Sequence, residues 1–179
     1  QGGTEIVKQK IDRALAKGVK VSGVWCQDWQ GIRITSFGKQ LLWNWNYDKN
    51  LYPELPIFIK SLNEKGIKFL GYINPFLALE GDLYKEASKR DYLVKNKKGD
   101  DYYIYTTTFP AAILDLTNLE TIEWIKSVMK KYMIEVGLSG WMADFGEYLP
   151  TDAVLHSGMS AEKFHNQYPV VWSKTVFDA

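Results

Sequence analysis

Residues 140–150 read GWMADFGEYLP, an apolar stretch that leads directly into an aspartate, a glycine and a glutamate. A short apolar run bounded by turn residues is typical of a buried strand. Both faces of such a strand are covered, and its last residues emerge at the edge of the sheet. Asp144 and Glu147 would then face a site at that edge of the sheet. The rest of the sequence indicates what kind of site it is.

A unit of one helix followed by one strand recurs along the chain. Each predicted helix ends at a glycine, and a short apolar strand follows, around Gly18, Gly66 and Gly137. Glycine readily adopts the left-handed conformation that ends a helix. The first helix is predicted from about Thr4, as its N-cap, and the second carries Pro56 in its first turn.

The later helices have start signals of their own. Thr117 and Glu120 have the spacing of a capping box, and an apolar stripe at helical spacing follows them. A fourth helix is predicted from near Ser160, and Pro169 is expected to kink or end it. Helices that alternate with short apolar strands predict βαβ units around a parallel sheet.

Polar residues follow each predicted strand at its carboxyl end. The three stretches are CQDWQGIR, NPF and DFGEYLP. Long insertions, residues 31–54 and about 81–110, follow the first two strands on the same side, and the second insertion holds a predicted hairpin that turns at residues 98–100. Parallel sheets carry their sites at the carboxyl ends of their strands, so we expect one site there.

The number of strands is too small for a complete fold. A barrel needs eight strands and typically ~250 residues, and an open three-stranded parallel sheet leaves both edges unpaired. We therefore predict an α/β fold in which residues 1–179 form a single segment of a larger barrel. The chain begins with Gln1 rather than Met, which favours a piece of a longer enzyme with the rest of the barrel as its partner.

Composition excludes several classes of function. A formal net charge of +1 gives no electrostatic attraction to nucleic acid or to an anionic membrane, and no apolar run is long enough to span a bilayer. The single cysteine, Cys26, excludes an internal disulfide and fits a reducing compartment, so we expect a cytoplasmic protein. Cys26 lies in a predicted strand, and a buried inert thiol is favoured there.

The sequence contains no pattern for a metal or a cofactor. His156 and His165 are too far apart to chelate zinc from one helix face, and the chain has neither a glycine-rich phosphate loop nor a nucleophile elbow. We therefore expect no metal and no cofactor. The 7 tryptophans either build the core or stack on sugar rings in a cleft.

Asp144 is the leading candidate for catalysis, because it stands at the end of the third predicted strand. The alternative is that it caps the following turn. Glu147 and Asp152 lie on the same loop, and Gln27 and Asp28 end the first strand and face the same opening. A cleft with carboxylates, amides and tryptophans suits glycoside hydrolysis, in which retention requires two carboxyl groups ~5 to 5.5 Å apart.

The same residues resemble a known family. Trp141, Asp144 and Glu147 in GWMADFGEYLP match the nucleophile segment of glycoside hydrolase family 31, retaining α-glycosidases built on a (β/α)8 TIM barrel. QGGTE, QDWQGIR, TSFGK, WNW and YINPF are similar to its sulfoquinovosidase branch, over essentially the whole chain. The resemblance implies that the chain covers about strands 2 to 4, and that the acid/base aspartate lies beyond Ala179.

The resemblance also implies roles for individual residues. Asp144 would be the nucleophile, Gln1 and Gln27 match glutamines that bind sugar hydroxyls, and Trp43 matches a tryptophan of the sulfonate pocket. The arginine that holds the sulfonate in that branch falls at Gln40 here, and a neutral amide offers no charge-assisted fork. Arg33 is not expected to compensate, because the branch has an arginine at that position as well.

These observations favour a retaining α-glycosidase, with α-glucosides ahead of α-sulfoquinovosides as substrates. Asp28, Gln40, Trp43, Trp141 and Glu147 join the two glutamines as predicted substrate-binding residues. Two other classes stay open: a non-catalytic carbohydrate-binding or interaction fragment, and a barrel enzyme that abstracts a proton with Asp144 as base. Exposed strand edges also allow a homo-oligomer.

Overall fold

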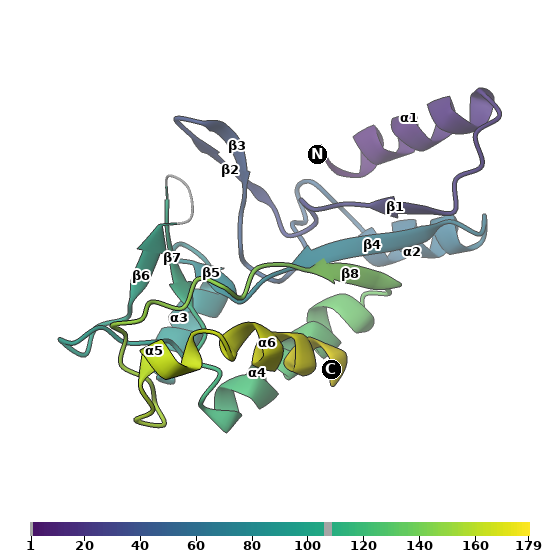
Figure 1. Ribbon diagram of the computed structural model, residues 1–179. Coiled ribbons are helices and arrows are strands. Elements are labelled where there is room, and N and C mark those ends of the chain that lie inside the picture. Colours follow the sequence, from purple (N-terminus) through teal and green to yellow (C-terminus); the bar gives the residue numbers. More distant parts are fainter. Residues whose placement is uncertain (1, 106–108) are drawn as a thin grey trace.

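The computed structural model describes residues 2–105 and 109–179 and contains a central parallel sheet (Figure 1). Its strands lie in the order β1-β4-β8: β1 (Gly23–Trp25), β4 (Lys68–Ile73) and β8 (Gly140–Ala143). Both pairings are parallel, with Trp25 opposite Leu70 and Leu70 opposite Gly140. The three predicted strands therefore form. Strands that are neighbours in the sheet belong to helix–strand units that follow one another in the chain.

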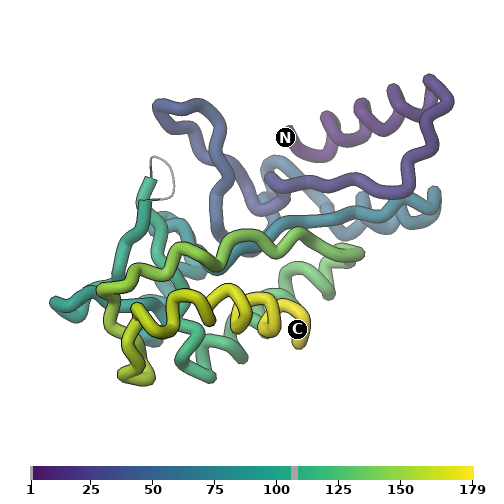
Figure 2. Tube along the Cα trace, in the orientation of Figure 1, coloured from purple at the N-terminus to yellow at the C-terminus, as the bar shows by residue number. Residues whose placement is uncertain are grey.

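A helix precedes each strand of the central sheet. They are α1 (Gly3–Ala16), α2 (Leu55–Asn63) and α4 (Leu119–Met129), the last continued by a π-helical turn η1 (Lys130–Ile134). Gly18, Gly66 and Gly137 all have positive φ after these helices, as predicted. After β8 the chain forms α5 (Ala161–Phe164) and α6 (Tyr168–Phe177), and α6 runs alongside α4 (Figures 1 and 2).

Both predicted insertions fold at the carboxyl end of the sheet. The first forms an antiparallel hairpin that the sequence patterns did not predict, β2 (Ile32–Thr35) and β3 (Gly38–Leu41). The second is wider than the predicted residues 81–110: it begins with β5 (Phe76–Ala78), continues through α3 (Asp82–Lys89) and β6 (Tyr103–Tyr105), and ends with β7 (Pro110–Ile113). Its strands form a small antiparallel sheet of order β5-β7-β6. In Figure 1 the hairpin and the small sheet stand on the same side of the central strands.

The predicted turn at residues 98–100 is confirmed, but the segments on its two sides pair through a single bridge instead of two hairpin strands. Gly99 has φ 88°, and the backbone N–H of Asn96 donates to the carbonyl of Asp100 at 2.8 Å. Lys95 and Asp101 form a single antiparallel bridge. The strand that follows, β6, pairs with β7 instead, because β7 offers a buried apolar partner.

The helix starts predicted near Thr4 and Ser160 are confirmed, since α1 begins at Gly3 and α5 begins at Ala161 with Ser160 as its N-cap. The predicted roles of Thr4 as an N-cap and of Pro169 as a helix end were wrong. Helix α1 begins at Gly3 with Gly2 as N-cap, while Thr4 is buried and its N–H donates to the carbonyl of Leu51 at 2.9 Å. Pro169 lies in the first turn of α6, where its missing N–H costs nothing, so it begins a helix instead of ending one.

The predicted capping box of the third helix was also wrong. Asn118 is the N-cap, and its side-chain oxygen accepts the N–H of Glu120 at 2.9 Å. The Thr117 hydroxyl donates instead to Asp115 at 2.6 Å. Asn118 is the cap because the Thr117 hydroxyl is already bonded to the buried side chain of Asp115.

Tryptophans occupy the core and join its layers. Trp29 and Trp45 are fully buried, and their indole N–H groups donate to the carbonyls of Tyr72 and Phe76 at 2.8 and 3.0 Å. Each ring therefore fixes an insertion to the strand or loop beneath it while filling a large volume. Most of the tryptophans thus belong to the core rather than to an open sugar cleft.

The central sheet has two open edges within the described residues, because β1 and β8 each pair only with β4. Trp25 and Met142 lie on these outer strands with 47% and 44% of their surfaces exposed. Large apolar side chains left bare on a strand edge indicate a surface that further strands cover. The partial barrel that the sequence predicts matches this arrangement.

After β8 the chain turns sharply at Gly146, which has φ 124°. A Cβ at this position would lie 3.1 Å from the Cα of Pro169 in α6. The turn therefore needs glycine both for its backbone conformation and for its close approach to a helix backbone.

We expect Gly146→Ala to lower the free energy of unfolding by roughly 2–4 kcal/mol, from left-handed strain and from the contact with α6. Gly158→Ala is the matched control, because Gly158 also has positive φ (73°) but open space around it. It should cost only about 1–2 kcal/mol. Urea unfolding of the longer protein measures both, and equal losses would contradict the role of the contact with α6.

Candidate active site

Asp144 directly follows β8 and is fixed at three points. Its backbone N–H donates to the carbonyl of Ile73 at 2.9 Å, which extends the β4–β8 ladder by one residue. Its carbonyl accepts the indole N–H of Trp172 at 3.2 Å, and its Oδ2 accepts the hydroxyl of Tyr72 at 2.8 Å. The carboxylate is therefore held rigidly at the carboxyl end of the sheet, where barrel enzymes place their catalytic groups.

Tyr72 is the side chain that orients Asp144. It lies on β4 with 3% of its surface exposed, and Asn74 donates to its hydroxyl at 3.3 Å. Burial raises the pKa of Tyr72, the bond from Asn74 opposes that rise, and the bond to Asp144 adds to it. Tyr72 is therefore a neutral donor at physiological pH, and its proton points at the carboxylate.

The residue after Asp144 is conformationally strained. Phe145 has φ 60°, which is uncommon for an aromatic residue and costs of order 1–3 kcal/mol. Its ring packs against Phe76, Tyr148 and Trp43, with centroids 5.3, 5.4 and 6.0 Å away. This aromatic packing holds the strained turn and forms one wall beside the carboxylate.

A hollow of about 350 Å³ opens next to Tyr72. Its lining is mostly aromatic, with one neutral amide: Gln40, Leu41, Trp43, Tyr72, Phe109, Phe145 and Tyr148. Trp43 is 5% exposed, and its buried indole N–H has no hydrogen-bond partner among the described residues. Aromatic faces with a few convergent polar groups are suited to a sugar ring.

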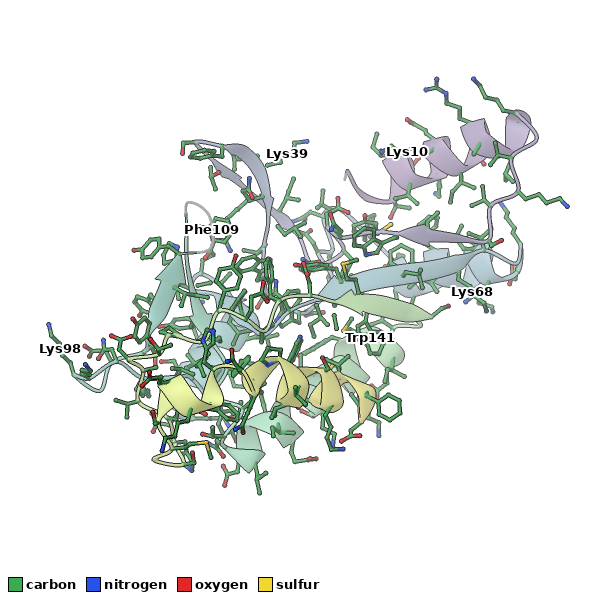
Figure 3. The ribbon with its side chains drawn as sticks, in the orientation of Figure 1. Lys10, Lys39, Lys68, Lys98, Phe109 and Trp141 are labelled. Carbon is green, nitrogen blue, oxygen red and sulfur yellow. The ribbon has the colours of Figure 1, made fainter. Side chains whose placement is uncertain are left out.

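The structure brings together some of the predicted site residues. Gln40 and Trp43 line the hollow, and Asp144 is bonded to its lining residue Tyr72. Trp141 lies half-buried on β8, and Glu147 is exposed on the loop after Asp144. Figure 3 labels Trp141 on the outer strand of the sheet.

Other predicted residues lie apart from this hollow. Gln27 and Asp28 line a second one, of about 250 Å³, between β1 and α1. Asp28 is 1% exposed, and its two carboxylate oxygens accept the hydroxyl of Tyr52 at 2.7 Å and the N–H of Gly2 at 2.6 Å. Both oxygens are thus engaged within the chain, which favours a structural role. Gln1 lies outside the described residues.

Asp152 is bonded elsewhere in the chain. Its Oδ1 accepts the hydroxyl of Tyr102 at 2.9 Å, and Tyr102 directly precedes β6. His165 contacts the carbonyl of Leu149 through Nδ1 at 2.6 Å, and His156 is exposed. Over residues 2–105 and 109–179, no three His, Cys, Asp or Glu side chains gather in a way that could hold a metal ion.

Cys26 follows β1 instead of lying within it, and it is buried. Burial, as the largest cause, raises its pKa to about 11, so the thiol stays protonated and unreactive. The expected burial of this thiol is confirmed. Within the described part of the chain, no helix is long and apolar enough to cross a membrane.

Sequence reasoning missed Tyr72 as a site residue. A usable signal was present, because Tyr72 and Asn74 are two residues apart in YIN and so lie on the same side of the strand. Tyr72 also pairs with Met142, two residues before Asp144, in the parallel register. That register is visible only in the assembled sheet.

Comparison with known proteins agrees with this geometry. The model of the glycosyl hydrolases family 31 TIM-barrel domain matches residues 3–179. The sulfoquinovosidase of Escherichia coli (strain K12) is 51% identical over 179 residues, which is 100% of this chain and 26% of that protein. The sulfoquinovosidase of Agrobacterium fabrum is 40% identical over 166 residues, covering 92% of this chain and 25% of that protein.

Solved structures are similar over the same range. A family 31 sulfoquinovosidase from E. rectale, in complex with an aza-sugar inhibitor, has a TM-score of 0.94 at 50% identity, over 98% of this chain and 26% of that chain. A dextranase from Flavobacterium johnsoniae has a TM-score of 0.79 at 20% identity and so shares the fold alone. The chain spans about a quarter of the length of its curated relatives. The parallel strands, the carboxylate at their ends and a family match over residues 3–179 together show that this chain belongs to glycoside hydrolase family 31.

Proposed function

We propose that the longer protein hydrolyses α-glycosidic bonds with retention and that Asp144 is its nucleophile. One observation carries the proposal: the carboxylate of Asp144 stands at the end of β8, oriented by the Tyr72 hydroxyl at 2.8 Å, beside an aromatic hollow that fits a sugar. A fixed carboxylate needs no reorganisation before it attacks.

The reaction divides into two displacements. A carboxylate oxygen of Asp144 attacks the anomeric carbon, and the bond to the leaving oxygen breaks as a carboxylic acid protonates that oxygen. Water then hydrolyses the glycosyl ester and regenerates the carboxylate. The acid/base group of this scheme belongs to the rest of the barrel, in line with the family resemblance.

As the substrate, we propose an α-sulfoquinovoside. This is an α-glycoside of sulfoquinovose, the sugar that differs from glucose by a sulfonate in place of the C6 hydroxyl. The supporting observation is that relatives at 51% and 50% identity over nearly the whole chain are sulfoquinovosidases. Gln40 supports the second candidate, a neutral α-glucoside, because an amide gives an anion no charge-assisted bond. The sequence patterns alone favoured the glucoside, and the identity to these relatives reverses that order.

Binding roles follow the same proposal. The unpartnered indole N–H of Trp43 donates to the sugar's C6 substituent, and Gln40 lies beside it in the hollow. The family resemblance alone supports Gln1 and Gln27 as ligands of ring hydroxyls, because Gln27 lines the second hollow and Gln1 lies outside the described residues. Trp141 and Glu147, which flank Asp144 in the chain, are proposed to shape the site around it. Two other functions are still open: binding of carbohydrate without catalysis, and proton abstraction by Asp144. The tests below distinguish both from hydrolysis.

We expect Asp144→Asn in the full-length protein to lower glycoside turnover by at least about 10³-fold, because an amide of the same shape is a poor nucleophile. Turnover of chromogenic α-sulfoquinovoside and α-glucoside measures this loss, and circular dichroism checks that the fold is retained. Asp152→Asn is the control, because Asp152 is bonded to Tyr102, and it should keep turnover within about twofold. Unchanged turnover in Asp144→Asn would remove Asp144 from the role of nucleophile.

Tyr72→Phe tests the positioning of the nucleophile. The variant loses the hydrogen bond to Asp144 but keeps the ring, so we expect kcat to fall about tenfold to hundredfold, with KM changed little. Tyr102→Phe is the matched control, because it also removes a tyrosine–aspartate bond, at Asp152. A change in KM alone, or equal losses in the two variants, would contradict the positioning role.

A further inference from the structure

A third hollow, of about 670 Å³, lies on the second insertion. Its lining comes from the turn at residues 96–101, from Tyr102, Tyr103 and Tyr105, and from Asp152, so we call it the tyrosine hollow. Among the described residues, none lines both this hollow and the one beside Tyr72. Figure 3 labels Lys98 at the outer end of the turn, well apart from Phe109 and Trp141.

The tyrosine hollow is also separate from the edges that further barrel strands cover. Its described lining includes no residue of β1 or β8, the two outer strands of the central sheet. In Figure 1, β6 and the turn before it lie at one end of the molecule, and β1 and α1 lie at the other. Strands added at the open edges therefore meet the central sheet and not the tyrosine hollow.

Two tyrosine rings on β6 face this hollow. Tyr103 and Tyr105 are two residues apart in the strand, so they project from the same side of the small sheet. Their side chains leave 45% and 69% of the residue surface exposed, whereas Ile104 between them is 8% exposed and packs into the core. Exposed tyrosine rings offer a flat apolar surface with a polar group at its end.

A chain of hydrogen bonds fixes the hydroxyl of Tyr103. The hydroxyl of Tyr84 donates to Oδ2 of Asp101 at 3.1 Å and lies 2.8 Å from the hydroxyl of Tyr103. A tyrosine has a single proton to donate. Tyr103 is therefore the donor in its bond to Tyr84, and its oxygen can only accept a further hydrogen bond from a ligand.

Asp101 sets the direction of this chain. Its carboxylate is 7% exposed and accepts Lys95 Nζ at 2.8 Å and the Ser88 hydroxyl at 2.6 Å. Burial alone would raise the pKa of Asp101, but the bonds from Lys95 and Ser88 bring it below its ordinary value, so the carboxylate is charged and only accepts. Burial raises the pKa of Tyr84, and its bonds to Tyr103 and Asp101 add to that rise, so Tyr84 keeps its proton.

The charges around the tyrosine hollow balance. Asp101 is neutralised by Lys95, and the other charged lining residues are two lysines and two aspartates: Lys97, Lys98, Asp100 and Asp152. Ammonium groups only donate hydrogen bonds, and carboxylates only accept them. A ligand with either net charge would meet a like charge, whereas hydroxyl groups can both donate and accept. The lining therefore favours a neutral ligand with several hydroxyls and an apolar face.

We propose that the tyrosine hollow binds a neutral carbohydrate. The rings of Tyr103 and Tyr105 stack on the apolar faces of the sugar, and the Tyr103 oxygen and the exposed Asp100 carboxylate accept hydrogen bonds from its hydroxyls. The hollow lies within the size range of roughly 300–1,000 Å³ that is usual for ligand pockets. Because the Tyr103 hydroxyl is held in place before the sugar arrives, less conformational entropy is lost on binding. The proposal goes beyond glycoside hydrolysis and does not rest on it.

The test is a binding measurement on the full-length protein with cellotetraose, a neutral chain of β-linked glucose. Hydrolysis of α-glycosidic bonds does not consume this probe, and saturation-transfer difference NMR gives its dissociation constant. We expect Tyr105→Ala to raise that constant at least about fivefold, because a stacking surface is lost. Tyr105→Phe keeps the ring and should stay within about twofold of the parent protein, which separates stacking from any general effect of substitution at this position.

Tyr103→Phe tests the acceptor, because it removes the hydroxyl and keeps the ring. We expect the dissociation constant to rise about twofold to tenfold, which corresponds to the loss of one hydrogen bond. Phe37→Ala is the matched control, because Phe37 is as exposed as Tyr105, at 73%, but lies in the turn between β2 and β3. It should leave the constant within about twofold.

Three results would overturn the proposal: no saturable binding of cellotetraose by the parent protein, an unchanged constant in Tyr105→Ala, and an equal loss in Phe37→Ala. Light scattering covers a different use of the surface. A parent protein that ignores cellotetraose but loses a dimer in Tyr105→Ala would reject the carbohydrate and assign the hollow to contact between copies. Glycoside turnover by the parent protein is measured separately, so failure of the proposed hydrolysis leaves the outcome at the tyrosine hollow readable.

Discussion

The hydrogen bond from Tyr72 to Asp144 depends on the parallel pairing of β4 with β8, and most features of the site follow from that pairing. A parallel ladder brings the carboxyl ends of neighbouring strands to one edge. Tyr72 and Asp144 are 72 residues apart in the chain, yet they meet at 2.8 Å because their strands end side by side. The oriented carboxylate is thus a consequence of register.

The aromatic residues give this edge its shape. Phe145 keeps its strained backbone because its ring is packed among Trp43, Phe76 and Tyr148. Phe76 in turn begins β5 and accepts the indole N–H of Trp45 through its carbonyl. The two insertions, the turn after Asp144 and the core are therefore packed together, so a change in one of these aromatic side chains would shift the Asp144 carboxylate as well.

Much of the fold was predictable because its signals are local. Glycines ended the helices where predicted, since left-handed residues are needed there whatever the tertiary context, and the strands that follow are short apolar runs. Capping was harder: Thr117 has the right spacing, but the buried Asp115 takes its hydroxyl and Asn118 caps α4 instead. The β2–β3 hairpin was missed, because its strands are short and partly exposed, without a clear alternation.

The sequence by itself determined the α/β class, the strands that end in polar residues and Asp144 as the candidate carboxylate, because each depends on residues close together in the chain. Only the tertiary structure decided that Tyr72 orients Asp144, that Asp28 is engaged by Tyr52 and Gly2, and that Arg33 lies opposite Gln40. These relations depend on strand register and on which buried donors find acceptors, and both are settled by packing between distant segments.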